Sequence, residues 1–552
     1  MRRSRFAFWA GMVLAGLGAA GCQTGTHEGA PNANARESSS ALGSSSVTLD
    51  PANMTRVGAV DERFQSYNVE MIEVTGGKFW KPYGPEIDAL LKEDKPAAAA
   101  PSEGDTPAGM DPRLYQYLPP IDLTNARLRK LAGALGPAYV RVSGTWANTS
   151  YLPETDQAPA QPPAGFIGLL TRRQWQGVVD FSKAVDAEIV TSFATGVGTR
   201  DASGAWRPDQ AARLVEYTKV LGGRIAAAEY MNEPNLAAMG GAPAGYTADA
   251  YGRDFKVFRE FARQAAPDML ILGPGSVGET TGDWGVAYGM ANVLKSRDLL
   301  AATGPGVDAF SYHHYGAASK RCTGTGTPAI TADAALSEAW LRRTDETLNF
   351  YRQLRDEFEP GRPFWLTETA DAACGGNPWG GTFLDTFRYL DQLGRLARQD
   401  VRVHMHNTLV ASDYGLLDDK TLTPKPSYWG ALLWRKLMGT TVLDPGVPIQ
   451  AGLHVYAHCL RGTVGGVALL VINNDKAAPR RVTVRGAGQR YTLSSGDLQS
   501  RTVQLNGAEL ALGAGDNFPN LTAVATQAGS LEFAPATITF IALPDVGNSA
   551  CR

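Results

Sequence analysis

Apolar and polar positions follow two different spacings along most of this chain, and each spacing predicts its own element. Short apolar runs such as "PAYVRVSG" (137–144) and "AEIVTSFATG" (187–196) are typical of buried strands. The stretches "TRRQWQGVVDFSKAV" (171–185) and "QAARLVEYTKVLG" (210–222) instead place apolar residues at helical spacing. Strands and helices are therefore predicted to alternate.

This alternation repeats about eight times over residues 63–440 and predicts a (β/α)8 TIM barrel of the α/β class. The further predicted strands are "IAAAEYMNEPN" (225–235), "MLILGPGS" (269–276), "VDAFSYHHYG" (307–316), "PFWLTETA" (363–370) and "VRVHMHNTLV" (401–410). A doubly wound sheet is the competing architecture. It is disfavoured because no glycine-rich nucleotide turn follows the first strand.

The spacing of apolar residues changes after about Thr441. Residues 441–552 contain short strand-like runs separated by Gly, Asn and Asp, with no helical spacing. This pattern predicts a C-terminal β-sandwich. The segment 46–62, which precedes the barrel, is expected to contribute a strand to that sandwich.

The first residues are typical of an export signal. Basic residues precede an apolar run too short to span a membrane comfortably, and small residues then lead to Cys22. This resembles a lipoprotein signal peptide (1–22) with lipidation of Cys22, followed by a disordered tether (23–45). We expect a protein that is exported and lipid-anchored in a bacterial cell envelope; plain secretion after cleavage near Ala20 is the alternative.

Composition restricts the partners. The chain has 552 residues, of which 44% are hydrophobic and 19% charged, with a formal net charge of −3. These values describe an ordinary soluble enzyme with no general attraction for polyanions, so no nucleic acid partner is expected. Contact with a membrane is expected through the lipid anchor only, and the protein is expected to be a monomer.

Four further cysteines, Cys322, Cys374, Cys459 and Cys551, match no zinc-site spacing. Export to an oxidising compartment favours disulfides, and four cysteines allow three pairings.

Two glutamates stand near the ends of predicted barrel strands. Glu233 lies between Asn232 and Pro234 after an apolar run, and Glu368 follows the apolar run at 364–366. Carboxyl ends of barrel strands meet at one face, so the two acids are expected to converge there. A paired acid and carboxylate is the chemistry that cleaves a glycosidic bond. The alternative is that both glutamates are salt-bridge partners in loops.

Two histidine pairs suggest a metal at first sight. His404 and His406 alternate on one predicted strand, but no third ligand accompanies them, so a structural role is expected. Adjacent His313 and His314 point to opposite faces of their strand. We expect neither a metal nor an organic cofactor.

Several ordered segments resemble the heparanase-like β-glucuronidases, glycoside hydrolase family 79, within the large clan of retaining (β/α)8 glycosidases. The resemblance runs from about Tyr67 to Cys551. It is carried by "GPAYVRVSGTWANTSYL", "MNEPN", "SYHHYG", "FWLTETADAACGG", "FLDTFRYLDQLGRLAR", "PSYWGALLWRKLMGTTVL" and "LHVYAHC".

The resemblance implies a role for each matching residue. Glu233 corresponds to the acid/base and Glu368 to the nucleophile. Cys459 is implied to pair with Cys551. The implied substrate-binding residues are Glu70, Thr145, Asn232, His313, Tyr315, Gly375, Gly376, Asn407 and Tyr414. Among these, Tyr315 is expected to hydrogen-bond the nucleophile, and the backbone N–H groups of the two glycines are expected to hold the sugar carboxylate.

The chain departs from the family pattern at two positions. Cys374 stands where the first residue of a glycine run is expected, and Ser143 replaces a glycine. The carboxylate pocket is therefore expected to differ. Cys374 is either tied to Cys322 or unpaired. No long excised segment interrupts the barrel, so activation by proteolysis is not implied.

These observations predict a retaining glycoside hydrolase that removes terminal β-linked glucuronic acid from a glycan or a small glucuronide. Endo cleavage of heparan sulfate is the second reading. Another retaining glycosidase, such as a β-xylosidase or β-glucosidase, is the third. The last is a non-catalytic surface protein that binds carbohydrate through Tyr414 and the Trp146 loop.

Overall fold

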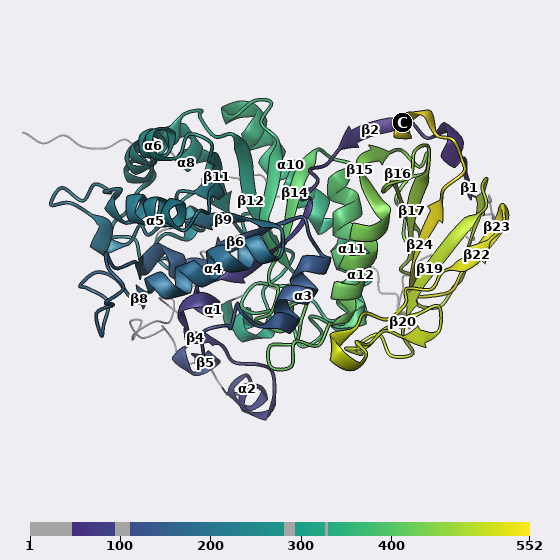
Figure 1. Cartoon of the computed structure of the whole chain (residues 1–552), viewed down its shortest axis with the longest axis horizontal. Helices are drawn as coiled ribbons and strands as arrows, with labels where there is room; N and C mark the ends of the chain where they lie inside the picture. The colour runs from purple at the N-terminus through teal and green to yellow at the C-terminus, as the bar shows by residue number, and fades with distance from the viewer. Residues whose placement is uncertain (1–46, 94–110, 281–292, 326–328) are drawn as a thin grey trace, which may run out of the picture. The chain divides into compact units, whose positions relative to one another are not determined.

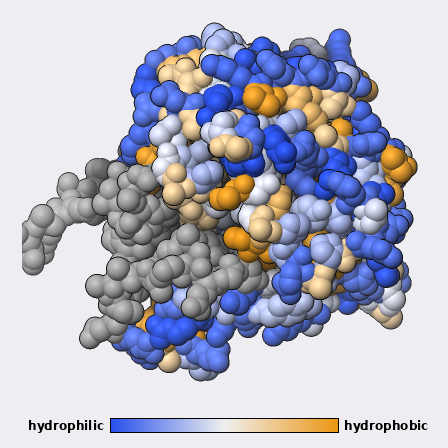
Figure 2. Space-filling model, turned by 90° about the vertical axis from the view of Figure 1, so that its left-hand side faces the viewer, coloured by the Kyte–Doolittle hydropathy of each residue, from blue (hydrophilic) through white to orange (hydrophobic). Residues whose placement is uncertain are grey.

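The computed structural model describes residues 47–93, 111–280, 293–325 and 329–552 (Figure 1). The predicted signal peptide, Cys22 and the tether lie outside these residues. No helix within the described ranges is both long and apolar enough to cross a membrane. The face in Figure 2 is mostly hydrophilic, with small and separate apolar patches.

Eight parallel strands form a closed barrel, which confirms the predicted fold class. Neighbours in the barrel are also neighbours in the sequence, and the last strand pairs with the first: His404 lies opposite Gln65. The strands are β3 (Gln65–Glu70), β6 (Ala138–Ser143), β9 (Ala187–Ser192), β10 (Ile225–Glu229), β11 (Leu270–Ser276), β12 (Ala309–Tyr315), β13 (Phe364–Ala370) and β14 (Val401–His406).

Helices surround this barrel and connect its strands (Figure 1). In the second connection Thr171 caps the helix by accepting a hydrogen bond from the N–H of Gln174, and the apolar face bearing Trp175 and Val179 is buried. The helices are α1 (Met71–Thr75), α2 (Pro85–Leu90), α3 (Ala126–Ala134), α4 (Arg172–Ala184), α5 (Asp209–Val220), α6 (Ala248–Ala265), α8 (Ser296–Thr303), α9 (Glu338–Leu341), α10 (Arg343–Phe358), α11 (Phe383–Ala397) and α12 (Pro426–Leu437).

Two antiparallel strands, β4 (Gly77–Trp80) and β5 (Tyr115–Leu118), follow α1 and pair with each other. A short parallel pair, β7 (Ser150–Tyr151) and β8 (Gly168–Leu169), follows β6.

The C-terminal part forms two packed sheets, as the strand pattern predicts. The larger sheet has nine strands and the smaller has three. The larger contains β2 (Arg56–Ala59), β15 (Met438–Leu443), β16 (His454–Leu460), β17 (Val467–Asn473), β19 (Gly488–Ser494), β20 (Gln504–Leu505), β21 (Ala508–Glu509), β22 (Val524–Thr526) and β24 (Thr537–Leu543). The smaller contains β1 (Val47–Leu49), β18 (Arg480–Val484) and β23 (Gly529–Phe533).

The segment before the barrel supplies a strand to each sheet, because β1 pairs with β18 and β2 pairs with β15. A disulfide joins Cys459 on β16 to Cys551 near the C-terminus.

Helix α11 is buried along its whole length between the barrel and the larger sheet (Figure 1). Its Gly394 allows the ring of Tyr456 to approach, since a Cβ there would lie 2.3 Å from that ring. Asp391 on the same helix accepts hydrogen bonds from the hydroxyl of Tyr456 and from Nδ1 of His454. These hydrogen bonds therefore connect helix α11 of the barrel to strand β16 of the sandwich.

Candidate active site

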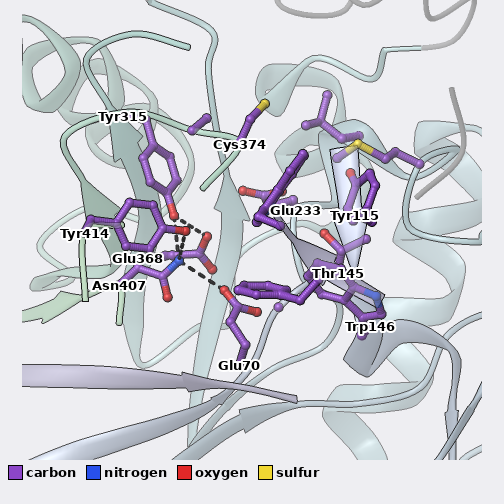
Figure 3. Close-up of a pocket in the computed structure, with 16 residues that line it drawn as sticks. Glu70, Tyr115, Thr145, Trp146, Glu233, Tyr315, Glu368, Cys374, Asn407 and Tyr414 are labelled. Atoms are coloured by element: carbon purple, nitrogen blue, oxygen red, sulfur yellow. Dashed lines mark hydrogen bonds between the residues drawn. The ribbon is translucent and has the colours of Figure 1, made fainter. Parts of the chain in front are cut away.

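A cavity opens at the carboxyl ends of the barrel strands (Figure 3). Its walls include the predicted residues Glu70, Thr145, Glu233, Tyr315, Glu368, Asn407 and Tyr414. Asn232, His313, Gly375 and Gly376 do not line the cavity. His313 contacts Glu233, and the two glycines pack against Trp80 and Tyr414, which do line it. Asn232 directly precedes Glu233 and contacts Arg141.

Glu368 lies on β13, with its carboxylate held at both oxygens. The hydroxyl of Tyr315 on β12 donates to Oε1 at 2.7 Å, and Nη1 of Arg141 on β6 lies 2.8 Å from Oε2. Burial and the nearby charge of Glu368 raise the pKa of Tyr315 well above its usual value, so its hydroxyl stays protonated as a donor. Donors on both sides fix the direction of the carboxylate.

Arg141 is completely buried and connects three polar side chains. Besides Glu368, its Nη2 lies 2.8 Å from Oε2 of Glu229 and 2.7 Å from Oδ1 of Asn232. Although burial opposes ionisation of Glu229, the positive charge of Arg141 and the hydrogen bond from the hydroxyl of Thr367 hold the pKa of that carboxyl below its usual value. Arg141 thus neutralises charge next to the site and orients Asn232.

Glu233 lies in the loop after β10, four residues past the end of the strand at Glu229. The expectation that the strand extends to Glu233 is therefore wrong: Tyr230 and Met231 continue the apolar pattern as buried loop residues. Glu233 has a φ of 48°, a left-handed conformation that is costly for a side chain with a Cβ. Such backbone strain is typical of functional sites.

Burial raises the pKa of Glu233 to about 7, with Arg141 opposing the rise and Glu229 adding to it. Its Oε1 lies 3.1 Å from Nδ1 of His313. Nη2 of Arg141 approaches the other ring nitrogen at 3.3 Å, and arginine can only donate.

The donor-only guanidinium beside Nε2 requires a ring nitrogen without a hydrogen, and burial lowers the pKa of His313, so both favour the neutral imidazole. With Nε2 as acceptor, the single ring hydrogen sits on Nδ1 and is donated to Oε1 of Glu233. The acidic proton of Glu233 is then left on Oε2. This carboxyl is arranged to deliver a proton near neutral pH.

One carboxylate oxygen of Glu233, one of Glu368 and a ring nitrogen of His313 lie within 4.8 Å of one another. These donor types are also those of a metal site. However, the guanidinium of Arg141 contacts Glu368 directly and disfavours a second cation there. The spacing of the two carboxyls suits general-acid and nucleophilic work on one bond.

A second polar group faces the cavity beside Glu368. Nδ2 of Asn407 lies 3.0 Å from Oε1 of Glu70, 2.9 Å from the oxygen of Tyr315 and 3.2 Å from that of Tyr414. Gly144 makes room for Glu70, since a Cβ there would lie 1.6 Å from Oε2. Burial, and then the charge of Glu368, raise the pKa of Glu70 well above its usual value. These groups suit recognition of sugar hydroxyls.

Thr145 begins a short 3-10 helix, Thr145–Thr149, after β6 and lines the opposite wall (Figure 3). That wall is aromatic: Phe79 and Trp80 on β4, Tyr115 on β5, and Trp146 face the cavity. The rings pair, with centroids 5.2 Å apart for Phe79 and Trp146.

The loop 374–376, which is expected to hold the sugar carboxylate, is not a simple run of glycines. Cys374 lines the cavity, while Gly375 packs against Trp80 and Gly376 against Tyr414. All three residues have positive φ, from 62° to 86°. Cys374 forms a disulfide with Cys322, which resolves the alternative that the sequence left open.

The family described as "Glycosyl hydrolase family 79, N-terminal domain" matches residues 120–394. This segment contains Glu233 and Glu368 together with Arg141, His313 and Tyr315. The chain belongs to glycoside hydrolase family 79.

Relatives across most of the chain agree with this assignment. Heparanase-like protein 1 of Arabidopsis thaliana is 27% identical over 497 residues, which cover 79% of this chain and 87% of the relative. Heparanase of Mus musculus is 27% identical over 511 residues, covering 81% and 90%. Baicalin-beta-D-glucuronidase of Scutellaria baicalensis is 28% identical over 316 residues, covering 54% and 56%.

Solved structures agree with the fold of this family 79 enzyme. A 4-O-alpha-L-rhamnosyl-beta-D-glucuronidase from Fusarium oxysporum has a TM-score of 0.58 at 13% identity, covering 90% of this chain and 99% of its own. An alpha-L-arabinofuranosidase from Thermotoga maritima has the same TM-score and the same coverage at 15% identity. These structures support the fold, a barrel with an added sheet domain, and the family match shows a glycoside hydrolase.

Sequence reasoning missed Arg141 and Glu229, the buried ion pair beneath the two glutamates of this family 79 site. One signal for Arg141 was available, because an arginine inside the apolar run "YVRVS" needs a buried acidic partner. The expected structural role of the other histidines fits their contacts: Nε2 of His404 lies 2.9 Å from Oε1 of Gln392, and Nε2 of His406 donates to the carbonyl of Tyr414.

Proposed function

We propose that this family 79 enzyme is a retaining β-glucuronidase, with Glu368 as nucleophile and Glu233 as acid/base. The proposal rests on the approach of the two carboxyls to within 4.8 Å at one end of the barrel. Carboxyls about 5–5.5 Å apart serve retaining hydrolysis, whereas about 6.5–9.5 Å is needed to admit the water of an inverting enzyme.

In the first step an oxygen of Glu368 bonds to the anomeric carbon while the bond from that carbon to the aglycone oxygen breaks. The departing oxygen takes the proton from Glu233. Water then attacks the anomeric carbon and gives a proton to the Glu233 carboxylate, and Glu368 leaves as a carboxylate. Two displacements preserve the β configuration and return both side chains to their starting states.

Glucuronic acid is the favoured sugar for two reasons. Relatives of the chain are named baicalin-beta-D-glucuronidase and heparanase. In addition, the hydroxyl of Tyr414 and the backbone of the loop 374–376 lie beside the cavity. Neutral hydroxyl and N–H donors bind a sugar carboxylate without needing a lysine.

Exo cleavage of a terminal residue is favoured over endo cleavage of a sulfated chain. The wall opposite Glu368 is aromatic, and among the described residues that line the cavity there is no lysine or arginine. A sulfated glycan would be expected to need cations along its path. Heparan sulfate cleavage is the second reading.

The deciding experiment compares hydrolysis of p-nitrophenyl β-glucuronide with that of the matching glucoside and xyloside. We expect the glucuronide to react fastest, and we expect Glu368→Ala to abolish that turnover while circular dichroism stays unchanged. Wild-type-like turnover by Glu368→Ala would contradict the role of the nucleophile. Faster hydrolysis of a neutral glycoside would indicate a different retaining glycosidase.

Two further outcomes separate the remaining readings. Shortening of heparan sulfate chains without hydrolysis of the small glucuronide would indicate an endo enzyme. Binding of glucuronides without any cleavage would indicate a carbohydrate-binding protein.

We also propose export with lipidation at Cys22, from the sequence motif alone. Labelling with a fatty acid analogue tests it: incorporation should disappear in Cys22→Ala. Incorporation that persists in this variant would contradict the proposal.

A further inference from the structure

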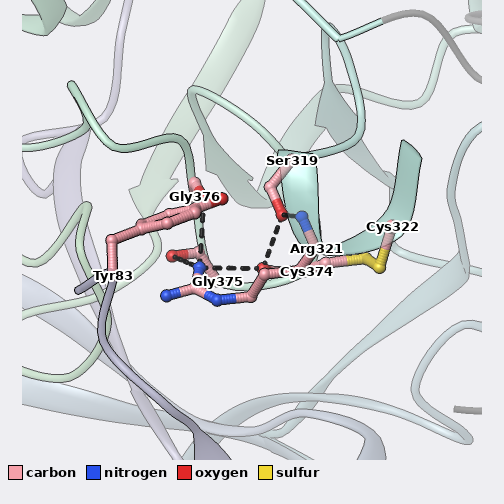
Figure 4. The surroundings of a disulfide bond; sticks show 7 residues. All are labelled: Tyr83, Ser319, Arg321, Cys322, Cys374, Gly375 and Gly376. Carbon is pink, nitrogen blue, oxygen red and sulfur yellow. Dashed lines mark hydrogen bonds between the residues drawn. A yellow bond between two sulfur atoms is a disulfide. The ribbon is translucent and has the colours of Figure 1, made fainter. Parts of the chain in front are cut away.

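One buried arginine holds the loop 374–376 from behind (Figure 4). Arg321 is 2% exposed, and its Nη1 donates to the carbonyl oxygens of Cys374, Gly375 and Gly376 at 3.3, 3.1 and 3.1 Å. The ring of Tyr83 covers the guanidinium at 4.0 Å, and its hydroxyl donates to the carbonyl of Gly376. Three successive carbonyls therefore point toward one cation.

The same contacts determine the direction in which the N–H groups of the loop point. In a planar trans peptide the N–H points away from the C=O of the same unit. Since the carbonyls of Cys374 and Gly375 face Arg321, the N–H groups of Gly375 and Gly376 face away from it. No described protein group accepts a hydrogen bond from either of these two N–H groups.

Arg321 also reaches two other parts of the cavity wall. Its Nη2 donates to the carbonyl of Lys81 at 2.7 Å and to Oδ2 of Asp413 at 2.6 Å. Lys81 follows Trp80, and Asp413 precedes Tyr414, and both of these aromatic residues line the cavity. One guanidinium thus binds the backbone of the lining residue Cys374 and the chain neighbours of two others, Trp80 and Tyr414.

The disulfide Cys322–Cys374 ties this arginine to the same loop by a covalent bond, because Cys322 is its neighbour in the chain. Ser319 adds a hydrogen bond from its hydroxyl to the carbonyl of Cys374 at 2.9 Å. The segment 319–322 and the loop 374–376 therefore form one cross-linked unit (Figure 4).

We propose that Arg321 and the Cys322–Cys374 disulfide are positioning elements that make the site selective for a carboxylated sugar. They present the N–H groups of Gly375 and Gly376, with Tyr414, in a fixed arrangement toward an anion. Neither element contacts the described carboxyls of Glu233 or Glu368, so the device acts on recognition and not on bond cleavage. This inference rests on the proposed β-glucuronidase function.

The test measures the ratio of kcat/KM for p-nitrophenyl β-glucuronide to that for the β-glucoside. In Cys322→Ser with Cys374→Ser, and in Arg321→Lys, we expect this ratio to fall about tenfold to a hundredfold, the effect of losing hydrogen bonds to a charged group. The fall should appear mainly in KM for the glucuronide, and kcat/KM for the glucoside should fall much less. Tyr83→Phe, which removes a single hydrogen bond, should give a smaller fall in the same direction.

A matched control is the other disulfide. Cys459→Ser with Cys551→Ser removes a cross-link in the sandwich and should leave the selectivity ratio unchanged. In that background, adding a reductant should reproduce the loss of selectivity, since Cys322–Cys374 is the disulfide that remains among the described residues.

An unchanged ratio in both loop variants would overturn the inference, and so would an equal loss for the two substrates, which indicates a merely structural role. Failure of the proposed function is distinguishable, because it would appear in the wild-type enzyme as absence of glucuronide hydrolysis.

Discussion

Tyr315 donates a hydrogen bond to Oε1 of Glu368 at 2.7 Å, from a neighbouring strand of the barrel. The other oxygen of Glu368 is engaged by Arg141. The carboxylate therefore has a single favoured orientation. In the proposed mechanism the same two donors stabilise its negative charge when Glu368 leaves in the second step.

We predict that Tyr315→Phe lowers kcat about tenfold to a hundredfold, because a hydrogen bond to a charged group is lost. Steady-state kinetics with p-nitrophenyl β-glucuronide measure this effect. Tyr312→Phe is the matched control: Tyr312 lies on the same strand, is buried, and its hydroxyl has no hydrogen-bond partner in the described structure. Equal rates in the two variants would contradict a role for the Tyr315 hydroxyl.

The two glutamates should respond in opposite ways to azide. With Glu233→Ala, the reactive p-nitrophenol still leaves, and azide replaces the water that has lost its base. We predict rate recovery and a β-linked glucuronyl azide. With Glu368→Ala, azide can attack only in place of the missing nucleophile and would give the α-linked product. Nuclear magnetic resonance of the products distinguishes them, and the reverse pattern would exchange the two roles.

The pH dependence should follow the raised pKa of Glu233. Its pKa is about 7, and the acid acts in its protonated form. We therefore predict that kcat/KM is lost above about pH 7, falling roughly tenfold for each further pH unit. A profile that stays flat to pH 9 would contradict Glu233 as the acid.

Glu229→Gln sharpens this test because it removes a negative charge that raises the pKa of Glu233, while Arg141 remains. The alkaline limb should move to lower pH in this variant. A shift to higher pH would contradict the electrostatic coupling.

Much of the fold was predictable because buried parallel strands appear as short apolar runs and amphipathic helices as periodic ones. Apolar runs do not show where a strand ends, and the segment before Glu233 is an example. Tyr230 and Met231 are as apolar and buried as the residues of β10, so hydrophobicity does not reveal that the strand stops at Glu229.

The sequence was enough to predict that Glu233 and Glu368 meet, because both lie near strand ends. It did not predict which residues contact and position them. Arg141 meets Glu229 across 88 residues and Glu368 across 227. Arg321 meets Lys81 across 240 and Asp413 across 92. No local spacing encodes contacts of this kind, because they are made by the closure of the barrel and the folding of its loops.

The contact between barrel and sandwich contains a charged histidine with a predictable effect on stability. Although burial opposes protonation of His454, Asp391 outweighs it, aided by Glu338, and raises the pKa of this histidine to about 9. A group with a raised folded-state pKa contributes stability that is complete below its unfolded pKa, near 6.5, and is lost as the pH rises through about 9.

We predict that His454→Asn, which keeps a donor but no charge, lowers the free energy of unfolding by up to roughly 3 kcal/mol near pH 6. The difference from wild type should shrink as the pH rises through about 9. Urea denaturation from pH 6 to 10 measures it. His458→Asn is the control on the same strand: burial lowers the pKa of His458 to about 4, so above about pH 7.5 it is neutral in both the folded and the unfolded chain, and over that range its curve should run parallel to wild type. A parallel curve for His454→Asn would contradict a charged His454 at this interface.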